Sequence, residues 1–360
     1  MGIIPAVTVQ KGTSSYVQQP GKTGRIAVIG AFDKDGCTVT SGTVTGLKLE
    51  NYTSLSKLQL ELGDGSKNFL GCKALPYLWH KNGGVSSVTV ANITSDSKAQ
   101  TEITTAKLAK ALELLMDEQF DILFVCAELD DTALETIVDF RADKLTKQSP
   151  IGFVAPLSRT STSDIIDSAA LFADGGAYGL LAQKLLYKDS ELTLVNSAAY
   201  YCSLLCDKKL DQSFTNKVLP DITGVNTEYT FEDGDDGYDL VEAGVTIFKI
   251  KDRINKKVVV VNSITPSGLD VCIERTVDYI IKDIYFDDFL GDRNTKKTLT
   301  AIESAMETKK KEYIASLELV EGLEYTVEKE SSECVNIYID SLIFAGVITK
   351  IGVYINVEVE

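Results

Sequence analysis

Apolar residues along the first two thirds of the chain fall into short runs that alternate with helical patterns. Short apolar runs predict buried strands, and apolar residues spaced three or four positions apart predict helices that cover a sheet. The expected strands are residues 26–31, 85–91, 120–127, 151–156 and 192–195, and the expected helices are residues 69–81, 101–117, 131–147 and 197–209. This alternation predicts an α/β layered domain with a mainly parallel sheet, whose strand order the pattern does not reveal.

The pattern changes after Pro220. Two apolar runs around a short polar turn predict a β-hairpin, which two amphipathic helices and three strand-like stretches follow. The expected hairpin strands are residues 245–251 and 256–264, the helices are residues 271–289 and 295–319, and the last strands are residues 325–330, 335–344 and 347–359. Asn294 is the expected N-cap of the second helix.

Each of these two helices has an apolar side that we expect to face a core. In the first helix this side consists of Ile273, Val277, Ile280, Ile281, Ile284 and Tyr285. In the second helix it consists of Leu299, Ile302, Met306, Tyr313 and Leu317. The C-terminal part is therefore expected to pack two helices on a mixed or antiparallel sheet.

Both ends of the sequence have the pattern of strands that require a partner. Near the start, a short β-prone group consists of Ile3, Ile4, Val7 and Val9, and polar residues follow it. Near the end, apolar and polar residues alternate almost strictly, which places Ile351, Val353, Ile355 and Val357 on one side of a strand. Such segments cannot bury themselves, so we expect them to extend as arms or edge strands.

The predicted organisation is α/β (α+β), with two domains between extended arms. A length of 360 residues suits about two domains. We expect an N-terminal arm over residues 1–20, an α/β domain over 21–220, a second domain over 221–346 and a C-terminal arm strand over 347–360.

Composition excludes several classes of protein. Asp and Glu number 52 against 36 Lys and Arg, for a net charge of −16, which argues against a nucleic-acid partner. No apolar run approaches the roughly 18–20 residues that cross a bilayer, and the start lacks the features of a signal peptide. The seven cysteines are scattered, and the pair Cys202 and Cys206 lacks metal-site spacing, which suggests reduced thiols.

The residues that catalysis usually requires are mostly missing. His80 is the only histidine and lies in a polar, loop-like stretch. Gly21, Lys22 and Thr23 end like a phosphate-binding loop, but a strand-like run follows where that loop needs a helix. The acidic stretch 228–242 fails the ligand pattern of a calcium loop and is expected to be a solvated loop. We therefore expect a protein that is not an enzyme and binds no cofactor or metal.

The second C-terminal helix carries a charged side that is open to two interpretations. Lys296, Thr300, Glu303, Glu307 and Lys311 share one polar side at helical spacing, and Lys297 adds a further cation at the start. One interpretation is a solvated surface with a Glu307–Lys311 pair one helical turn apart. The other is a docking surface for an acidic partner.

Four stretches of the second half resemble the contractile tail sheath family of phage tails and phage-tail-like bacteriocins. They are residues 197–216 (SAAYYCSLLCDKKLDQSFTN), residues 242–248 (EAGVTIF), residues 273–280 (IERTVDYI) with the following Asn294, and the closing alternating strand. Together they lie within about residues 195–360. The chain is compact beside larger sheaths, which carry additional outer domains.

The resemblance implies a mechanical function. Sheath subunits form stacked rings around a tail tube, and their arms add strands to the sheets of neighbouring subunits. It implies intersubunit roles for the arm residues named above and a tube-facing role for the helix that carries Lys296, Lys297, Thr300, Glu303, Glu307 and Lys311. Contraction would follow a baseplate trigger through rearrangement of subunits and would drive the tube through a bacterial envelope.

The implied partners are other copies of the chain, the tail tube protein, and the baseplate and tail terminator proteins. The implied location is a virion or phage-tail-like particle assembled in the bacterial cytoplasm, with neither nucleic acid nor stable membrane insertion. Two alternatives stay open. One is another self-assembling phage or prophage tail or capsid-associated protein. The other is an α/β enzyme that uses acids such as Asp233, Asp235 and Asp236.

Overall fold

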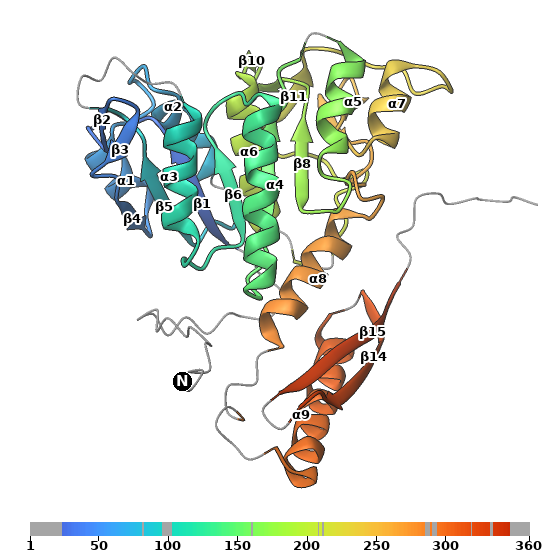
Figure 1. Ribbon diagram of the computed structural model, residues 1–360. Helices are drawn as coiled ribbons and strands as arrows, with labels where there is room; N and C mark the ends of the chain where they lie inside the picture. Colours follow the sequence, from blue (N-terminus) through green and yellow to red (C-terminus); the bar gives the residue numbers. More distant parts are fainter. Residues whose placement is uncertain are drawn as a thin grey trace, which may run out of the picture.

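The computed structural model describes an α/β body and a smaller helix-and-hairpin unit below it, joined by helix α8 (Val271–Asp283) (Figure 1). The described residues are 24–80, 83–95, 103–159, 161–207, 209–210, 212–284, 289, 294–317, 319–331 and 334–345. The two expected arms lie outside the described residues. The same holds for the candidate residues of the arms, which are Ile3, Ile4, Val7, Val9, Ile351, Val353, Ile355 and Val357.

The body is built on a sheet of six strands in the order β4-β5-β1-β6-β7-β8. The strands are β4 (Leu49–Tyr52), β5 (Ser87–Asn92), β1 (Arg25–Gly30), β6 (Ile122–Val125), β7 (Gly152–Pro156) and β8 (Ala177–Leu181). All neighbours are parallel except the edge pair β4–β5. The expected mainly parallel sheet is confirmed, and its near-continuous apolar strands are typical of a sheet covered on both sides.

Helices cover both sides of this sheet. On one side Val28 packs in a core with helices α1 (Leu55–Leu62), α2 (Leu70–Leu78) and α6 (Leu194–Asp207). On the other side Ile29 packs with α3 (Thr105–Leu115), α4 (Asp131–Thr146) and α5 (Thr162–Ala170). The expected strand at residues 192–195 is wrong, because Leu194 and Val195 open α6. That helix is buried all round, so its start has the continuous apolar pattern of a buried strand.

Several short elements complete the body. They are hairpin β2 (Thr38–Thr40)–β3 (Thr43–Thr45), the small sheet of β9 (Leu185–Tyr187), β10 (Ser190–Glu191) and β11 (Ile222–Val225), helix α7 (Asp236–Glu242), and hairpin β12 (Phe248–Asp252)–β13 (Lys257–Val260). The predicted hairpin after Pro220 is thus present. The acidic stretch is not a loop throughout, since α7 forms its second half and buries Leu240.

Packing on the body continues well past residue 220. Val258, Val260 and Val271 belong to one of its two cores, and Val245 and Ile247 belong to the other. The change of packing therefore comes at α8 rather than at the expected boundary near residue 220. The hairpin β12–β13 reads as a separate pattern in the sequence, but its apolar side completes the core under α6.

The smaller unit consists of helix α9 (Lys296–Ser316) and hairpin β14 (Val320–Lys329)–β15 (Val335–Phe344). Its core gathers Leu210, Tyr279, Ile280, Met306, Tyr313, Leu317, Val320 and Leu323. The N-cap of α9 is Thr295, whose Oγ1 accepts a hydrogen bond from the Thr298 amide at 3.3 Å. Asn294, the expected cap, instead donates to the carbonyl of Ser331 at 2.9 Å and so supports the β14–β15 turn.

The cysteines are free thiols, as expected, and only Cys334 is not fully buried. Within the described ranges, no helix is both long and apolar enough to cross a membrane.

Candidate functional site and assembly surfaces

Helix α8 binds the body through its charged side rather than its apolar side. Glu274, Arg275 and Asp278 are buried, whereas Ile273 and Val277 are only half-buried. Of the expected apolar side, Ile280 is buried, Ile281 and Ile284 are half-buried, and Tyr285 lies outside the described residues. The expectation of a buried apolar side is thus largely wrong, because the body offers α8 hydrogen-bond partners instead.

Glu274 and Arg275 begin this set of contacts. The Glu274 carboxylate accepts hydrogen bonds from the amide of Gly176 at 3.0 Å and from the hydroxyl of Thr265 at 2.7 Å. The Arg275 guanidinium donates to the carbonyl of Leu205 at 2.7 Å, at the end of α6. Buried charges cost much less when such partners satisfy them. These contacts fix the first turn of α8 against β8 and α6.

Asp278 continues the contacts one turn further along α8. Its carboxylate accepts a hydrogen bond from the Tyr178 hydroxyl at 2.6 Å and lies 3.9 Å from the Arg141 guanidinium. Burial raises the pKa of Asp278 to about 6, although Arg141 and Tyr178 act in the opposite direction. The carboxyl group is therefore held in a site that favours its neutral form.

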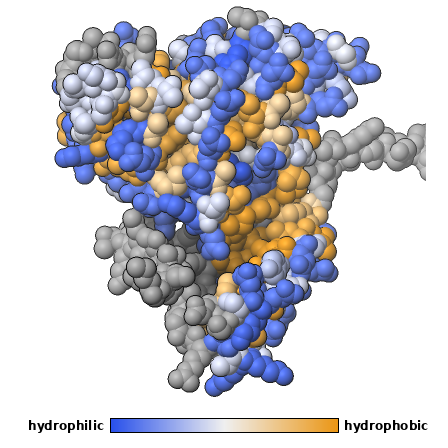
Figure 2. Space-filling model, in the orientation of Figure 1, coloured by the Kyte–Doolittle hydropathy of each residue, from blue (hydrophilic) through white to orange (hydrophobic). Residues whose placement is uncertain are grey.

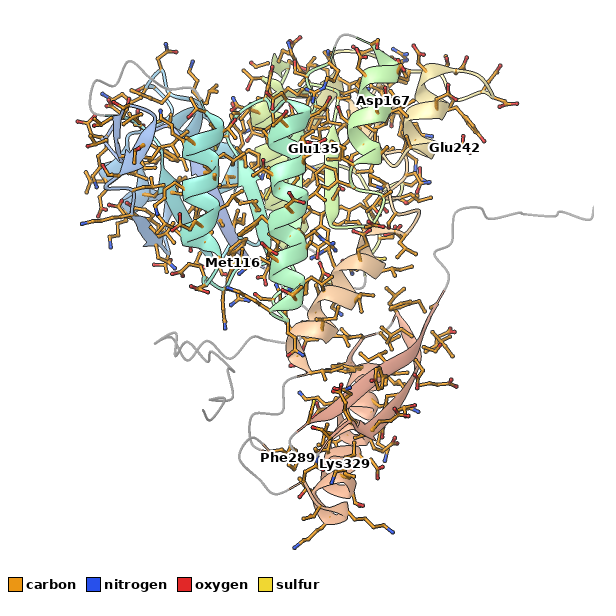
Figure 3. The ribbon with its side chains drawn as sticks, viewed as in Figure 1. Met116, Glu135, Asp167, Glu242, Phe289 and Lys329 are labelled. Atoms are coloured by element: carbon orange, nitrogen blue, oxygen red, sulfur yellow. The ribbon has the colours of Figure 1, made fainter. Side chains whose placement is uncertain are left out.

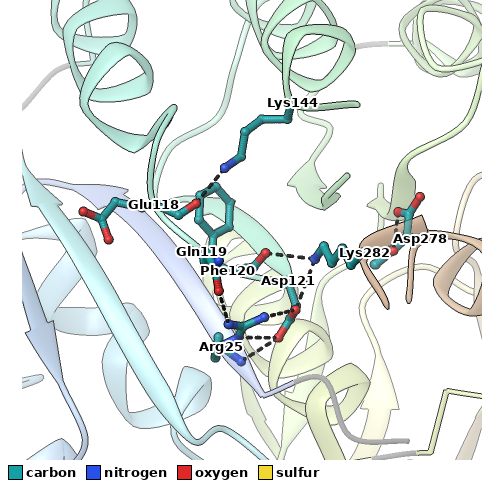
Figure 4. A network of polar contacts seen from close by, with 9 residues as sticks. Arg25, Glu118, Gln119, Phe120, Asp121, Lys144, Asp278 and Lys282 are labelled. Atoms are coloured by element: carbon teal, nitrogen blue, oxygen red, sulfur yellow. Dashed lines mark hydrogen bonds and ion pairs between the residues drawn. The ribbon is translucent and has the colours of Figure 1, made fainter. Parts of the chain in front are cut away.

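The last turn of α8 binds Asp121 through Lys282 (Figure 4). Its carboxylate is 3.2 Å from the Lys282 ammonium and 3.0 Å from the Arg25 guanidinium, and its side chain is 3% exposed. Burial acts to raise the pKa of Asp121, but the charges of Lys282 and Arg25 outweigh it and hold the pKa at about 2. Arg25 is the first residue of β1, and Lys282 lies in the last turn of α8. Asp121 therefore connects the start of the body to its last helix.

Lys144 lies beside this junction, at the end of α4. Its ammonium donates to the carbonyl of Glu118 at 2.6 Å and lies 4.9 Å from the centre of the Phe120 ring. Burial lowers the pKa of Lys144 to about 8. A second bond from the same ammonium, to the carbonyl of Met116 at 3.2 Å, joins the end of α4 to the end of α3.

Helix α9 presents the charged side that the sequence predicts. Lys296, Lys297, Thr300, Glu303 and Lys311 are exposed, and Glu307 is half-exposed. Lys311 and Glu307 form the expected pair at 3.6 Å. On the opposite side Ile302, Met306 and Tyr313 are buried. The structure therefore brings the six candidate residues onto the solvent side of one helix, which is compatible with both interpretations given above.

Hairpin β14–β15 has open edges and an incompletely covered inner side. Within the described part of the chain each strand pairs only with the other, so each leaves one edge free. Helix α9 packs on β14, and Ile337, Ile339 and Leu342 of β15 remain half-buried. Figure 2 shows an apolar surface where the body meets this hairpin. Free strand edges beside apolar side chains can accept further strands.

His80 is part of the core rather than of a polar loop. The side chain is buried, and its Nε2 lies 3.3 Å from both the Tyr187 hydroxyl and the Asp221 carboxylate. Its ring also meets the ring of Tyr200 edge-on. Across the described ranges, no group of His, Cys, Asp and Glu side chains has the arrangement of a metal site.

No family model and no curated protein matches the sequence. Solved structures do match. A sheath tail protein from Desulfitobacterium hafniense is similar with a TM-score of 0.64 and 11% identity, over 92% of this chain and 98% of that one.

Two structures of the anti-feeding prophage are also similar. Its helical sheath in the contracted state has a TM-score of 0.66 and 13% identity over 99% of both chains. A chain of its baseplate has a TM-score of 0.63 and 12% identity over 100% of both chains. The chain thus has the fold of tail sheath proteins over nearly its whole length.

Proposed function

We propose that this chain is the structural subunit of a contractile tail sheath, which polymerises helically around a rigid tail tube. The observation that carries the proposal is the agreement in fold with a contracted helical sheath over 99% of both chains. Agreement from end to end means that the body and the smaller unit both have counterparts there. The resemblance of residues 273–280 to the sheath family supports the same conclusion independently of the fold.

In this proposal the two arms connect neighbouring subunits. The apolar residues Ile3, Ile4, Val7 and Val9 of one arm and Ile351, Val353, Ile355 and Val357 of the other would add strands to the sheets of neighbours. The free edges of β14 and β15 offer backbone groups for this pairing. Backbone hydrogen bonds of an added strand persist while subunits move as rigid bodies.

The solvent side of α9 would face the tail tube. Lys296 and Lys297 supply positive charge, and Thr300, Glu303, Glu307 and Lys311 continue the same side. Exposed ion pairs contribute only about 0–1 kcal/mol each, so a contact built from them holds the tube and releases it readily. The resemblance implies an outward domain over residues 21–220 and a tube-proximal domain over 221–346. With the boundary moved to α8, the body would lie outward and the unit of α9, β14 and β15 next to the tube.

Contraction would then be a rearrangement of rigid subunits. The buried contacts of Glu274, Asp278 and Lys282 keep α8 fixed on the body, so motion occurs between subunits rather than within the body. Baseplate and terminator proteins would lie at the two ends of the sheath. The whole would form a phage tail or phage-tail-like particle assembled in the bacterial cytoplasm. The free energy of contraction would come from the difference in subunit packing between the extended and the contracted lattice.

The test is electron microscopy of the purified full-length chain at high concentration. Hollow helical tubes are the expected result. A variant that ends at Thr349 should remain a folded monomer, by circular dichroism and thermal unfolding, and should form no tubes. Normal tubes from this variant would contradict the arm assignment. A small closed ring from the full chain would favour a baseplate-type component, in line with the similarity to a baseplate chain.

A further inference from the structure

The turn of hairpin β12–β13 carries an exposed aliphatic side chain among lysines. Ile254 is 92% exposed, and Val218 nearby is 49% exposed. An open groove of about 590 Å³ is lined by both residues and by Lys251, Asp252, Arg253 and Lys257. Single exposed aliphatic residues are ordinary. Here two of them lie together in one groove among charged side chains, so a partner that packs on them also meets those charges.

Arg253 and Lys256 at this turn form ion pairs within the chain, and Lys257 lies opposite Asp252 in the hairpin. Arg253 pairs with Glu228 at 2.5 Å, and Lys256 pairs with Asp189 at 2.8 Å. Three more lysines are exposed and form no ion pair with any described residue: Lys217, Lys251 and Lys257. In a chain of net charge −16 this is a local excess of positive charge, which attracts an acidic surface.

The segment 228–242 carries the complementary charge. Within it, Glu228 is already paired with Arg253 of the same chain. The other exposed acids form no ion pair with the described part of the chain and are Glu232, Asp233, Asp236, Asp239 and Glu242. Tyr238 of α7, 40% exposed, adds an aromatic side chain among them. The loop before α7 projects from the body (Figure 1), and Glu242 lies on the same part of the surface as Asp167 of α5 (Figure 3).

We propose that the basic tip, defined as Lys217, Val218, Lys251, Ile254 and Lys257, binds the acidic segment 228–242 of a second copy of this chain. The aliphatic pair of the tip packs against Tyr238 of that copy, and the lysines meet its carboxylates. The inference rests on the proposed function, because the subunits of a sheath must touch one another.

Two different surfaces meet in this contact, so it is heterologous. Repetition of a heterologous contact gives a ring or an open helical array rather than a two-fold dimer. Exposed charges are screened over about 10 Å at 0.1 M salt, so the contact weakens as salt rises.

Charge reversal with rescue tests the contact. Lys251→Glu with Lys257→Glu should raise the protein concentration needed for assembly at low salt at least tenfold. Adding Asp233→Lys and Asp236→Lys should restore assembly. The matched control is Lys48→Glu with Lys57→Glu, two exposed lysines elsewhere on the body, with the same change in net charge. Assembly of the first variant at the control's concentration, or absence of rescue, would overturn the contact.

A cross-linking experiment separates this contact from the proposed function. A photoreactive amino acid at position 254, in a mixture of isotope-labelled and unlabelled chains, should join position 254 of one copy to residues 228–242 of another. Tubes with cross-links elsewhere, or with none, would overturn the contact and leave the sheath function standing. Cross-links at residues 228–242 without tubes would support the contact and count against a helical sheath.

Discussion

The Lys282 ammonium of α8 lies 3.2 Å from the Asp121 carboxylate at the end of the loop before β6, residues that are far apart in the sequence. The same carboxylate binds Arg25 at the first residue of β1. One buried acid thus holds both segments through which the chain enters and leaves the body. The stability of the subunit should depend strongly on it.

Asp121→Asn should lower the free energy of unfolding by about 3 kcal/mol, because it removes a buried carboxylate and leaves two half-buried cations without that counter-charge. Urea unfolding followed by circular dichroism measures the change. Asp117→Asn is the matched control, since Asp117 forms an exposed pair with Lys147 and should contribute about 0–1 kcal/mol. Equal effects of the two variants would show that the junction is not a major contact.

Asp278 should make the subunit less stable as pH rises. Its pKa is about 6 in the fold and near 3.8 when unfolded, so the unfolded chain loses the proton first. Between these values the contribution of Asp278 to stability should fall, by about 3 kcal/mol in total at roughly 1.4 kcal/mol per pH unit.

Asp278→Asn should therefore remove this fall. The measurement is urea unfolding of both proteins at several values between pH 4 and pH 6.5. Asp121 has a lowered pKa of about 2, so its contribution to stability falls as pH falls below about 5. It is present in both proteins, so the difference between them isolates Asp278. A difference between the two proteins that does not change with pH would contradict the raised pKa.

Met306→Ala should weaken the smaller unit by about 2–5 kcal/mol, because Met306 is fully buried at the centre of its core. The control is Ile314→Ala. Ile314 lies two turns further along α9 and is 41% exposed, so its loss should lower the stability of the unit much less. Hydrogen exchange of α9 and β14 amides measures both effects. Faster exchange confined to this unit would show that it unfolds separately from the body.

Lys296→Glu with Lys297→Glu should leave the unfolding free energy nearly unchanged, since both side chains are exposed. Under the proposed function it should weaken co-sedimentation with the tail tube protein about tenfold at low salt. Lys48→Glu with Lys57→Glu again serves as the control. Equal co-sedimentation of both variants would remove the tube-facing assignment from α9.

The layered body is predictable from the sequence because its strands and helices differ in hydrophobic period. Where the sequence pattern predicts the wrong element, the cause is physical. The hydrophobic pattern predicts a strand at Leu194 and Val195, since a helix buried on all sides has no polar side to reveal its period. Thr295 and Asn294 are both good caps, and only the contact of Asn294 with the β14–β15 turn decides between them.

Helical periodicity predicts the wrong orientation for α8. Helical periodicity assigns Ile273 and Val277 to the core because it assumes that charges face water. Arg275 and Asp278 instead find their partners at Leu205 and Tyr178, which no local pattern connects to them. Both are residues of the stretch 273–280 that carries the family resemblance, so that stretch marks where α8 attaches to the body.

The partners of α8 come from segments that are distant in the sequence, and this imposes an order on folding. Gly176, Tyr178, Leu205 and Asp121 take their places only when β6, β8 and α6 have packed together. Until then the charges of α8 have nothing to bind, and closing such long loops is slow. During synthesis, the helix-and-hairpin unit should therefore dock last, after the ribosome has released most of the body.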